Sequence, residues 1–162
     1  MANDTLTRPR IFVDTSVVVA GVFSGTGGSR LLLELGESRV VDLVVGSSVL
    51  AELDGVIGRK APSARTTVAR LLDSANVAIG RPPTDREVKL AARLIAYRPD
   101  AVVLAEALAS QPDYLVSLDK RHFLTEPTTS SLPFPVGSPG ECLTWLRGRF
   151  KLAVRARPRR DG

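Results

Sequence analysis

The chain has 162 residues, which suits one domain with a buried core, and its 44% hydrophobic content is typical of a soluble globular protein. The single cysteine excludes an intrachain disulfide, and with only one histidine a zinc site of thiolates and imidazoles is nearly excluded. The net charge of +5 is unevenly distributed: residues 1–146 carry a net charge of −1, whereas seven basic residues and one acid follow from position 147.

The first ten residues, MANDTLTRPR, contain no apolar signal-peptide core, and no apolar run reaches transmembrane length. We therefore expect a cytoplasmic protein with no membrane association. A metal ion in such a protein would be held by oxygen ligands, which favours Mg²⁺ or Mn²⁺.

Short apolar runs alternate with helical patterns along the chain. The predicted strands are residues 10–13, 42–45, 76–79 and 113–117. The predicted helices are residues 28–38, 47–60, 62–74, 84–98, 100–109 and 138–148. Ser138 is expected to cap the last helix, with Pro139 at its first position, after a Pro/Ser/Thr-rich loop at 126–139. The alternation predicts an α/β fold with a mainly parallel central sheet.

The charge distribution and the last helix suggest a division of the chain. We expect a folded domain over residues 1–148 and a basic, flexible C-terminal tail over residues 149–162. The tail is a candidate for nonspecific RNA binding, which would be sensitive to salt.

Asp14 is a carboxylate inside the apolar run IFVDTSVVV, at the end of the first predicted strand. Burial of an ionised carboxylate costs several kcal/mol unless partners or a metal ion compensate it. Asp14 is either the N-cap of a helix that begins near Thr15, or a metal ligand at the carboxyl end of the strand. Position alone does not choose between these interpretations.

Two further acids lie at comparable positions. Asp119 follows the fourth predicted strand, where it is either a turn residue or a second group in the same crevice. Asp100 lies in the first turn of a helix and shares the inward stripe with Val103 and Leu104. An acid that complements the helix dipole needs no such alignment, so the alignment favours a functional role.

The predicted helix 47–60 carries two acids beside its apolar stripe. Glu52 and Asp54 flank Leu53 almost symmetrically, about 100° to either side. Helical periodicity does not decide which of them, if either, faces a site. The lone His122 is interpreted as a surface or structural histidine rather than a catalytic base.

Four of these acids would need a cation if they met in one pocket. Carboxylates at close range repel one another, and a divalent ion neutralises them. Such an ion would also acidify a bound water and stabilise charge on a phosphodiester during hydrolysis. No serine or histidine nucleophile is required for this chemistry.

Four segments, FVDTSVVVAGVF, VVGSSVLAEL, PDAVVLAEALA and DYLVSLDKRHF, occur in the order and approximate spacing of the PIN-domain nucleases. The chain resembles this family over about residues 10–145, and is most similar to the branch of toxins from toxin–antitoxin pairs. The resemblance implies a three-layer α/β/α sandwich, frequently dimeric, that cleaves RNA with Mg²⁺ or Mn²⁺. It also implies an antitoxin protein as a partner.

The resemblance assigns the catalytic and metal-binding quartet to Asp14, Glu52, Asp100 and Asp119, and so selects Glu52 over Asp54. Ser16 stands where many members have Asn, Leu118 where Gly is common, and Asp100 lacks an adjacent second acid. Residues expected to orient the acids or bind substrate are Thr15, Ser16, Ser117, Lys120 and Arg121. The last two are equally well explained as solvated turn charges.

Two other functions compete with the metal-dependent endoribonuclease. One is a catalytically inactive PIN-like binding or scaffold module, which resemblance of fold does not exclude. The other is a phosphatase of the haloacid-dehalogenase type, which also begins with Asp after a strand. That class requires a second Asp two residues later, where this chain has Ser16.

Overall fold

The central sheet has five parallel strands in the order β3-β2-β1-β4-β5. The computed structural model describes residues 7–125, 128 and 130–155, and the statements below concern these residues. The strands are β1 (Arg10–Val13), β2 (Asp42–Val45), β3 (Ala78–Ile79), β4 (Tyr114–Val116) and β5 (Val136–Gly137). The predicted α/β fold with a parallel sheet is thus confirmed.

The strands in the middle of the sheet are buried on both faces. Ile11, Phe12 and Leu115 are completely inaccessible to solvent, as expected for a parallel sheet covered by helices on both sides. β5 is a strand that the sequence did not predict, because it lies in the stretch read as a Pro/Ser/Thr-rich loop. It is an edge strand next to β4, a position where neighbouring prolines are tolerated.

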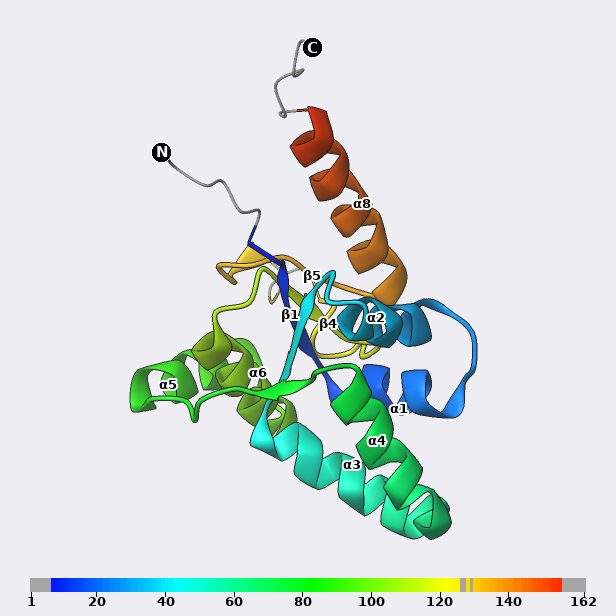
Figure 1. Cartoon of the computed structure of the whole chain (residues 1–162). Helices are drawn as coiled ribbons and strands as arrows, with labels where there is room; N and C mark the ends of the chain where they lie inside the picture. Colours follow the sequence, from blue (N-terminus) through cyan, green and yellow to red (C-terminus); the bar gives the residue numbers. More distant parts are fainter. Residues whose placement is uncertain (1–6, 126–127, 129, 156–162) are drawn as a thin grey trace.

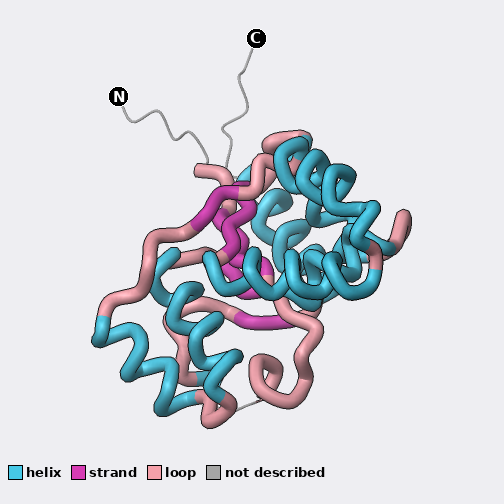
Figure 2. Tube along the Cα trace, turned by 90° about the horizontal axis from the view of Figure 1, so that it is seen from below, coloured by secondary structure: helices cyan, strands magenta, loops and turns pink. Residues whose placement is uncertain are grey.

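Helices cover both faces of the sheet, which gives the three-layer α/β/α sandwich (Figures 1 and 2). The helices are α1 (Thr15–Phe23), α2 (Gly28–Glu37), α3 (Ser47–Lys60), α4 (Arg65–Ser74), α5 (Asp85–Leu94), α6 (Arg98–Ser110) and α8 (Pro139–Arg155), with a 3-10 turn at Pro62–Ala64. Helices α2 and α8 pack against each other, and they contact the sheet at β2 and at β4 and β5, respectively. Helix α6 contacts the sheet at β2, and α5 packs against α6. The chain moves across the sheet in one direction from β1 to β3 and returns in the other direction to β4. Because crossovers between parallel strands are right-handed, the helices before β3 and those after it are expected on opposite faces of the sheet.

The predicted helix 84–98 ends earlier than expected. Helix α5 stops at Leu94, and α6 begins at Arg98, with Pro99 in its first turn. A proline inside a helix lacks the N–H donor, and its ring clashes with the carbonyl four residues earlier, which here is that of Ile95. The preceding helix therefore cannot run up to Pro99, and the break places Asp100 in the first turn of α6.

The first turn of α3 is capped by a side chain from another helix. The buried Glu106 of α6 accepts hydrogen bonds through Oε1 from the backbone N–H of Ser48 at 3.0 Å and the hydroxyl of Ser47 at 2.9 Å. It thereby satisfies a backbone donor that every helix leaves unpaired at its start. A Cβ at Gly46 would collide with the Glu106 carboxylate, so this close approach requires glycine. The contact fixes the start of the helix that carries Glu52.

The N-terminus of α8 confirms the predicted cap. The Ser138 hydroxyl accepts from the Glu141 N–H, and Glu141 accepts from the Ser138 N–H at 2.7 Å, which is a capping box. The helix continues to Arg155, beyond the predicted end at 148, because arginine, lysine, leucine and alanine are good helix formers. The predicted domain boundary at 148 stays a prediction.

Within the described ranges, no single helix is long and apolar enough to cross a membrane. Only α1 and α2 taken together pass that test, and the pair is bent by 90°.

Candidate active site

The carboxyl ends of β1 and β4 meet where the strand order reverses. The two strands are hydrogen-bonded neighbours, with Val13 opposite Val116, and β1 is followed by the crossover to β2 on its other side. In parallel sheets this switch point is where ligands bind. Asp14 follows β1 there, and Ser117 and Asp119 follow β4.

Asp14 occupies the N-cap position of α1, but its side chain makes no capping hydrogen bond. Instead, its Oδ2 accepts from the Ser16 hydroxyl at 2.8 Å and the Ser117 hydroxyl at 2.6 Å. The residue is only 6% exposed. The N-cap interpretation thus holds for the backbone of Asp14 alone, while its carboxylate is held at the crevice by two serines. The role of Asp14 as a metal ligand stays a prediction.

The two acids of α3 have different surroundings. Glu52 accepts a hydrogen bond from the Thr15 hydroxyl at 3.0 Å and so lies at the crevice. Asp54 points away and forms an ion pair with Arg65 at 3.2 Å, with its side chain 69% exposed. Periodicity left these two acids equivalent, and the tertiary structure separates them.

Asp100 and Asp119 meet at the imidazole of His122. Nδ1 of His122 lies 2.6 Å from Oδ2 of Asp100 and 3.1 Å from Oδ2 of Asp119. The other oxygen of Asp119 accepts from the backbone N–H groups of Arg121 and His122. His122, which the sequence suggested was a surface or structural residue, therefore contacts two of the four acids.

The surroundings of Asp100 and Asp119 shift the pKa values of these two carboxyl groups in opposite directions. Burial, reinforced by the neighbouring carboxylate of Asp119, raises the pKa of Asp100 from 3.8 to about 6. Burial acts in the same direction on Asp119, but the hydrogen bonds from Arg121 and His122 outweigh it and lower the pKa of Asp119. The ionised carboxylate of Asp119 is thus stabilised by protein donors, whereas that of Asp100 lacks a sufficient counter-charge.

A cavity of about 260 Å³ lies between these elements. All four acids line it, together with Thr15, Ser16 and Lys60. Lys60, at the last position of α3, was missed as a site residue. It follows Glu52 by eight residues, about 80° further round the helix, so helical spacing could have placed it on the same side.

The two basic residues after Asp119 lie elsewhere. Lys120 lines a hollow with Leu124 and Glu141, and Arg121 lines another with Tyr97 and His122, whose Nδ1 reaches the acids from that side. Neither is among the residues that form the cavity of the acids. Their assignment as substrate-binding residues stays a prediction.

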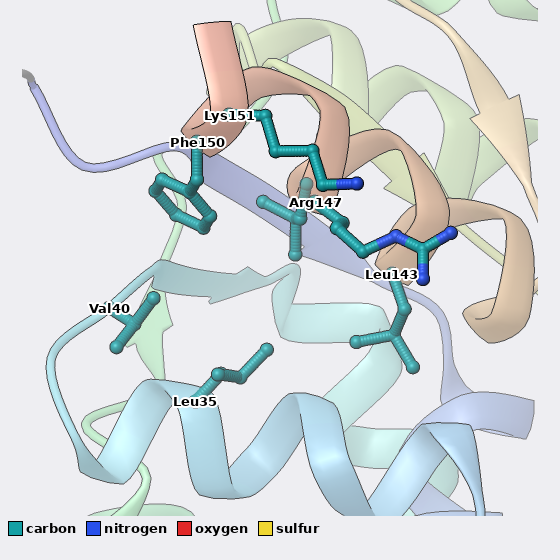
Figure 3. A pocket seen from close by; sticks show the side chains of 7 residues that line it. Leu35, Val40, Leu143, Arg147, Phe150 and Lys151 are labelled. Atoms are coloured by element: carbon teal, nitrogen blue, oxygen red, sulfur yellow. The ribbon is translucent and has the colours of Figure 1, made fainter. Parts of the chain in front are cut away.

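A second concave feature lies between α2 and α8, and we call it the α2–α8 groove (Figure 3). It has a volume of about 640 Å³ and is lined by Leu35, Val40, Leu143, Leu146, Arg147, Phe150 and Lys151. Its floor is apolar, and the side chains of Arg147 and Lys151 add positive charge. The groove contains no acid, so its chemistry differs from that of the cavity at the switch point.

The cavity of the acids suits a divalent cation. Oδ2 of Asp100 is buried, and although Nδ1 of His122 lies 2.6 Å away, it makes no hydrogen bond with the described residues. A further partner would relieve the cost of this burial. Ligand atoms of Asp100, Asp119 and His122 all lie within 4.8 Å of one another. The carboxylate oxygens of this group are hard donors of the kind that binds Mg²⁺ and Mn²⁺.

The fold and the site together define an α/β/α protein with an acidic crevice at the carboxyl edge of a parallel sheet. The sequence profile of the PIN domain matches residues 10–121, and the chain belongs to the PIN domain family. This membership confirms the resemblance and supports a nuclease, a hydrolytic enzyme.

A solved structure shares this architecture. It is described as the crystal structure of VapBC2 from Rickettsia felis bound to a DNA fragment from their promoter. The match has a TM-score of 0.58 and 16% sequence identity, and covers 80% of this chain and 98% of that one. At this identity the likeness is one of fold. No curated protein matches the sequence significantly.

Proposed function

We propose that the protein is a metal-dependent endoribonuclease that hydrolyses RNA phosphodiester bonds at Asp14, Glu52, Asp100 and Asp119. The observation that carries this proposal is that all four acids, from four separate segments, line one cavity. Mg²⁺ or Mn²⁺ is the cofactor that these carboxylates fit. When bound, the ion would supply an acidified water and stabilise negative charge on the phosphate.

The chain's own residues keep the carboxylates in place. The hydroxyls of Ser16 and Ser117 orient Asp14, and the hydroxyl of Thr15 orients Glu52. Lys60 lines the same cavity, and its ammonium is a candidate to contact an RNA phosphate. RNA as the substrate rests on the motif resemblance and on the basic residues from position 147 onward.

We extend the proposal to a toxin that is silenced by an antitoxin protein. The structural neighbour is a VapBC2 complex, which supports such a partner. The α2–α8 groove offers a surface for it, because the groove has an apolar floor beside Arg147 and Lys151. These features fit an amphipathic segment that carries acidic residues. A homodimer and a cytoplasmic location, both implied by the resemblance, complete the proposal.

The rival phosphatase requires an acid two residues after Asp14. Ser16 supplies a hydroxyl there, and it donates to the Asp14 carboxylate at 2.8 Å. The inactive-module alternative is separated from the nuclease by experiment, because both share the PIN fold.

The test compares Glu52→Gln with the matched control Asp54→Asn. Both variants neutralise an acid of α3, but only Glu52 lines the cavity. Cleavage of single-stranded RNA in Mn²⁺ is expected to fall more than about a hundredfold in Glu52→Gln, since even indirect supports of a metal site cost 10- to 100-fold. The control keeps its activity. Cleavage that continues in excess chelator, or no cleavage by the unmodified protein, would refute the proposal.

A further inference from the structure

The imidazole of His122 lines the hollow next to the cavity of the acids, and its Nδ1 reaches two of them. Its Nδ1 lies 2.6 Å from Oδ2 of Asp100 and 3.1 Å from Oδ2 of Asp119. Two ligands at right angles on an ion with bonds of about 2.1 Å lie about 3 Å apart. The distance to Asp119 matches this spacing, the distance to Asp100 is somewhat shorter, and ligand atoms of the three residues all lie within 4.8 Å of one another.

The contact with Asp100 does not satisfy that carboxylate. Nδ1 is hydrogen-bonded to Asp119, whereas Oδ2 of Asp100 has no aligned partner among the described residues despite the short distance. Asp100 carries a buried oxygen that points at the same place as a ring nitrogen. With the ring proton on Nε2, a cation bound by both Nδ1 of His122 and Oδ2 of Asp100 would satisfy the two groups together.

The ring is held in this orientation by its surroundings. Tyr97 stacks on it, with ring centroids 5.2 Å apart and planes at 17°. Oδ1 of Asp119 accepts from the backbone N–H groups of Arg121 and His122, which fixes the turn and leaves Oδ2 directed to the site. A ligand held by stacking and by a tight turn loses little freedom when it binds an ion.

We propose that His122 is a ligand of the same metal ion and makes the site prefer Mn²⁺ over Mg²⁺. The inference rests on the proposed metal-dependent function. Mn²⁺ is a transition-metal ion that accepts imidazole nitrogen beside carboxylate oxygens, whereas Mg²⁺ is bound almost entirely by oxygen. The four carboxylates supply only oxygen ligands, so the nitrogen of His122 is the ligand that would make the site prefer Mn²⁺ over Mg²⁺.

Pulsed electron paramagnetic resonance tests the inference without any assay of activity. The full chain without a histidine tag is loaded with one equivalent of Mn²⁺. Because His122 is the only histidine in the sequence, a nitrogen coupling typical of bound imidazole can come from no other side chain. The expected spectrum shows this coupling, and Mn²⁺ bound without it would overturn the inference while leaving the carboxylate site intact.

A variant of His122 tests the preference of the site for Mn²⁺ over Mg²⁺. His122→Phe keeps an aromatic ring to stack on Tyr97 but removes both nitrogens. By calorimetric titration we expect its Mn²⁺ affinity to fall at least about tenfold, with a smaller loss for Mg²⁺. Equal losses for the two ions would overturn the role as a ligand. Failure of the unmodified protein to bind either ion would instead refute the proposed function itself, and Asp54→Asn is the control for surface charge.

Discussion

The hydroxyl of Ser117 donates a hydrogen bond of 2.6 Å to the carboxylate of Asp14, which lies 103 positions earlier in the chain. The same hydroxyl accepts from the backbone N–H of Asp119 at 3.0 Å. Ser117 is completely buried. One side chain thus joins the carboxyl ends of β1 and β4 and sets the relative positions of two acids.

Replacement of Ser117 by alanine is expected to affect both stability and the metal site. Asp14 loses a donor, and the free energy of unfolding should fall by about 1–3 kcal/mol, the typical cost of a lost bond to a charged group. The thermal stabilisation by Mn²⁺ should also shrink, because Asp14 is no longer held in place. Urea denaturation and melting curves with and without Mn²⁺ measure the two effects.

Ser110→Ala is the matched control for this variant. Ser110 is also a buried serine, but its hydroxyl bonds to the backbone carbonyl of Glu106 within the same helix. It should lose a small amount of stability and respond to Mn²⁺ like the unmodified protein. If Ser117→Ala behaved in the same way, the serine would have no role in positioning Asp14.

Gly46→Ala is expected to destabilise the protein. The new Cβ would collide with the Glu106 carboxylate, which would have to withdraw from the start of α3. Strain of this kind costs about 1–3 kcal/mol. Gly148→Ala is the contrast: it lies inside α8, and apart from the backbone of that helix and the adjacent residues no described atom lies within 4 Å of its added Cβ. It should gain about 0.5–1 kcal/mol, measured by urea denaturation.

Stability of the metal-free protein should depend on the protonation of Asp100. The folded protein raises the pKa of Asp100 from 3.8 to about 6, so the folded state binds this proton more tightly than the unfolded chain. Its contribution to stability is therefore lost as the pH rises through this interval. In excess chelator, Asp100→Asn should gain stability relative to the unmodified protein between about pH 4 and pH 6. If the difference in free energy of unfolding between Asp100→Asn and the unmodified protein did not change with pH, this prediction would be wrong.

Truncation after Phe150 should weaken RNA binding and flatten its dependence on salt. The removed segment contains five basic residues and one acid. Each lost phosphate contact on a single strand lowers the slope of log affinity against log salt by about 0.7. Binding titrations at several salt concentrations measure the slope, and circular dichroism checks that the fold persists. An unchanged slope would mean that the segment makes no phosphate contacts.

The α2–α8 groove gives a prediction about the antitoxin. We expect the gene immediately upstream to encode a small DNA-binding protein that copurifies with this chain on coexpression. Reversal of charge at Arg147 and Lys151 should weaken that complex, because both side chains line the groove. Arg93→Glu on α5, an exposed cation on another helix, is the control. If the complex formed normally after charge reversal at both Arg147 and Lys151, the groove would be excluded as the docking surface.

Much of the architecture was predictable because it depends on local patterns. The strands 10–13 and 42–45 and the helix 47–60 were placed at their observed bounds, since apolar runs and helical periodicity are properties of short segments. Strand β5 was missed because its pairing with β4, rather than its own composition, makes it a strand. The early end of α5 follows from Pro99, whose effect on the preceding helix was underestimated.

The sequence by itself determined the fold class and the set of acids available for a site, because hydrophobic periodicity and motif order are carried along the chain. Only the tertiary structure decided how those acids are surrounded. It put Glu52 beside Thr15 and Asp54 beside Arg65, and it brought His122 against Asp100. These contacts depend on the register of parallel strands and on the crossing of helices, which bring together residues that no local pattern relates.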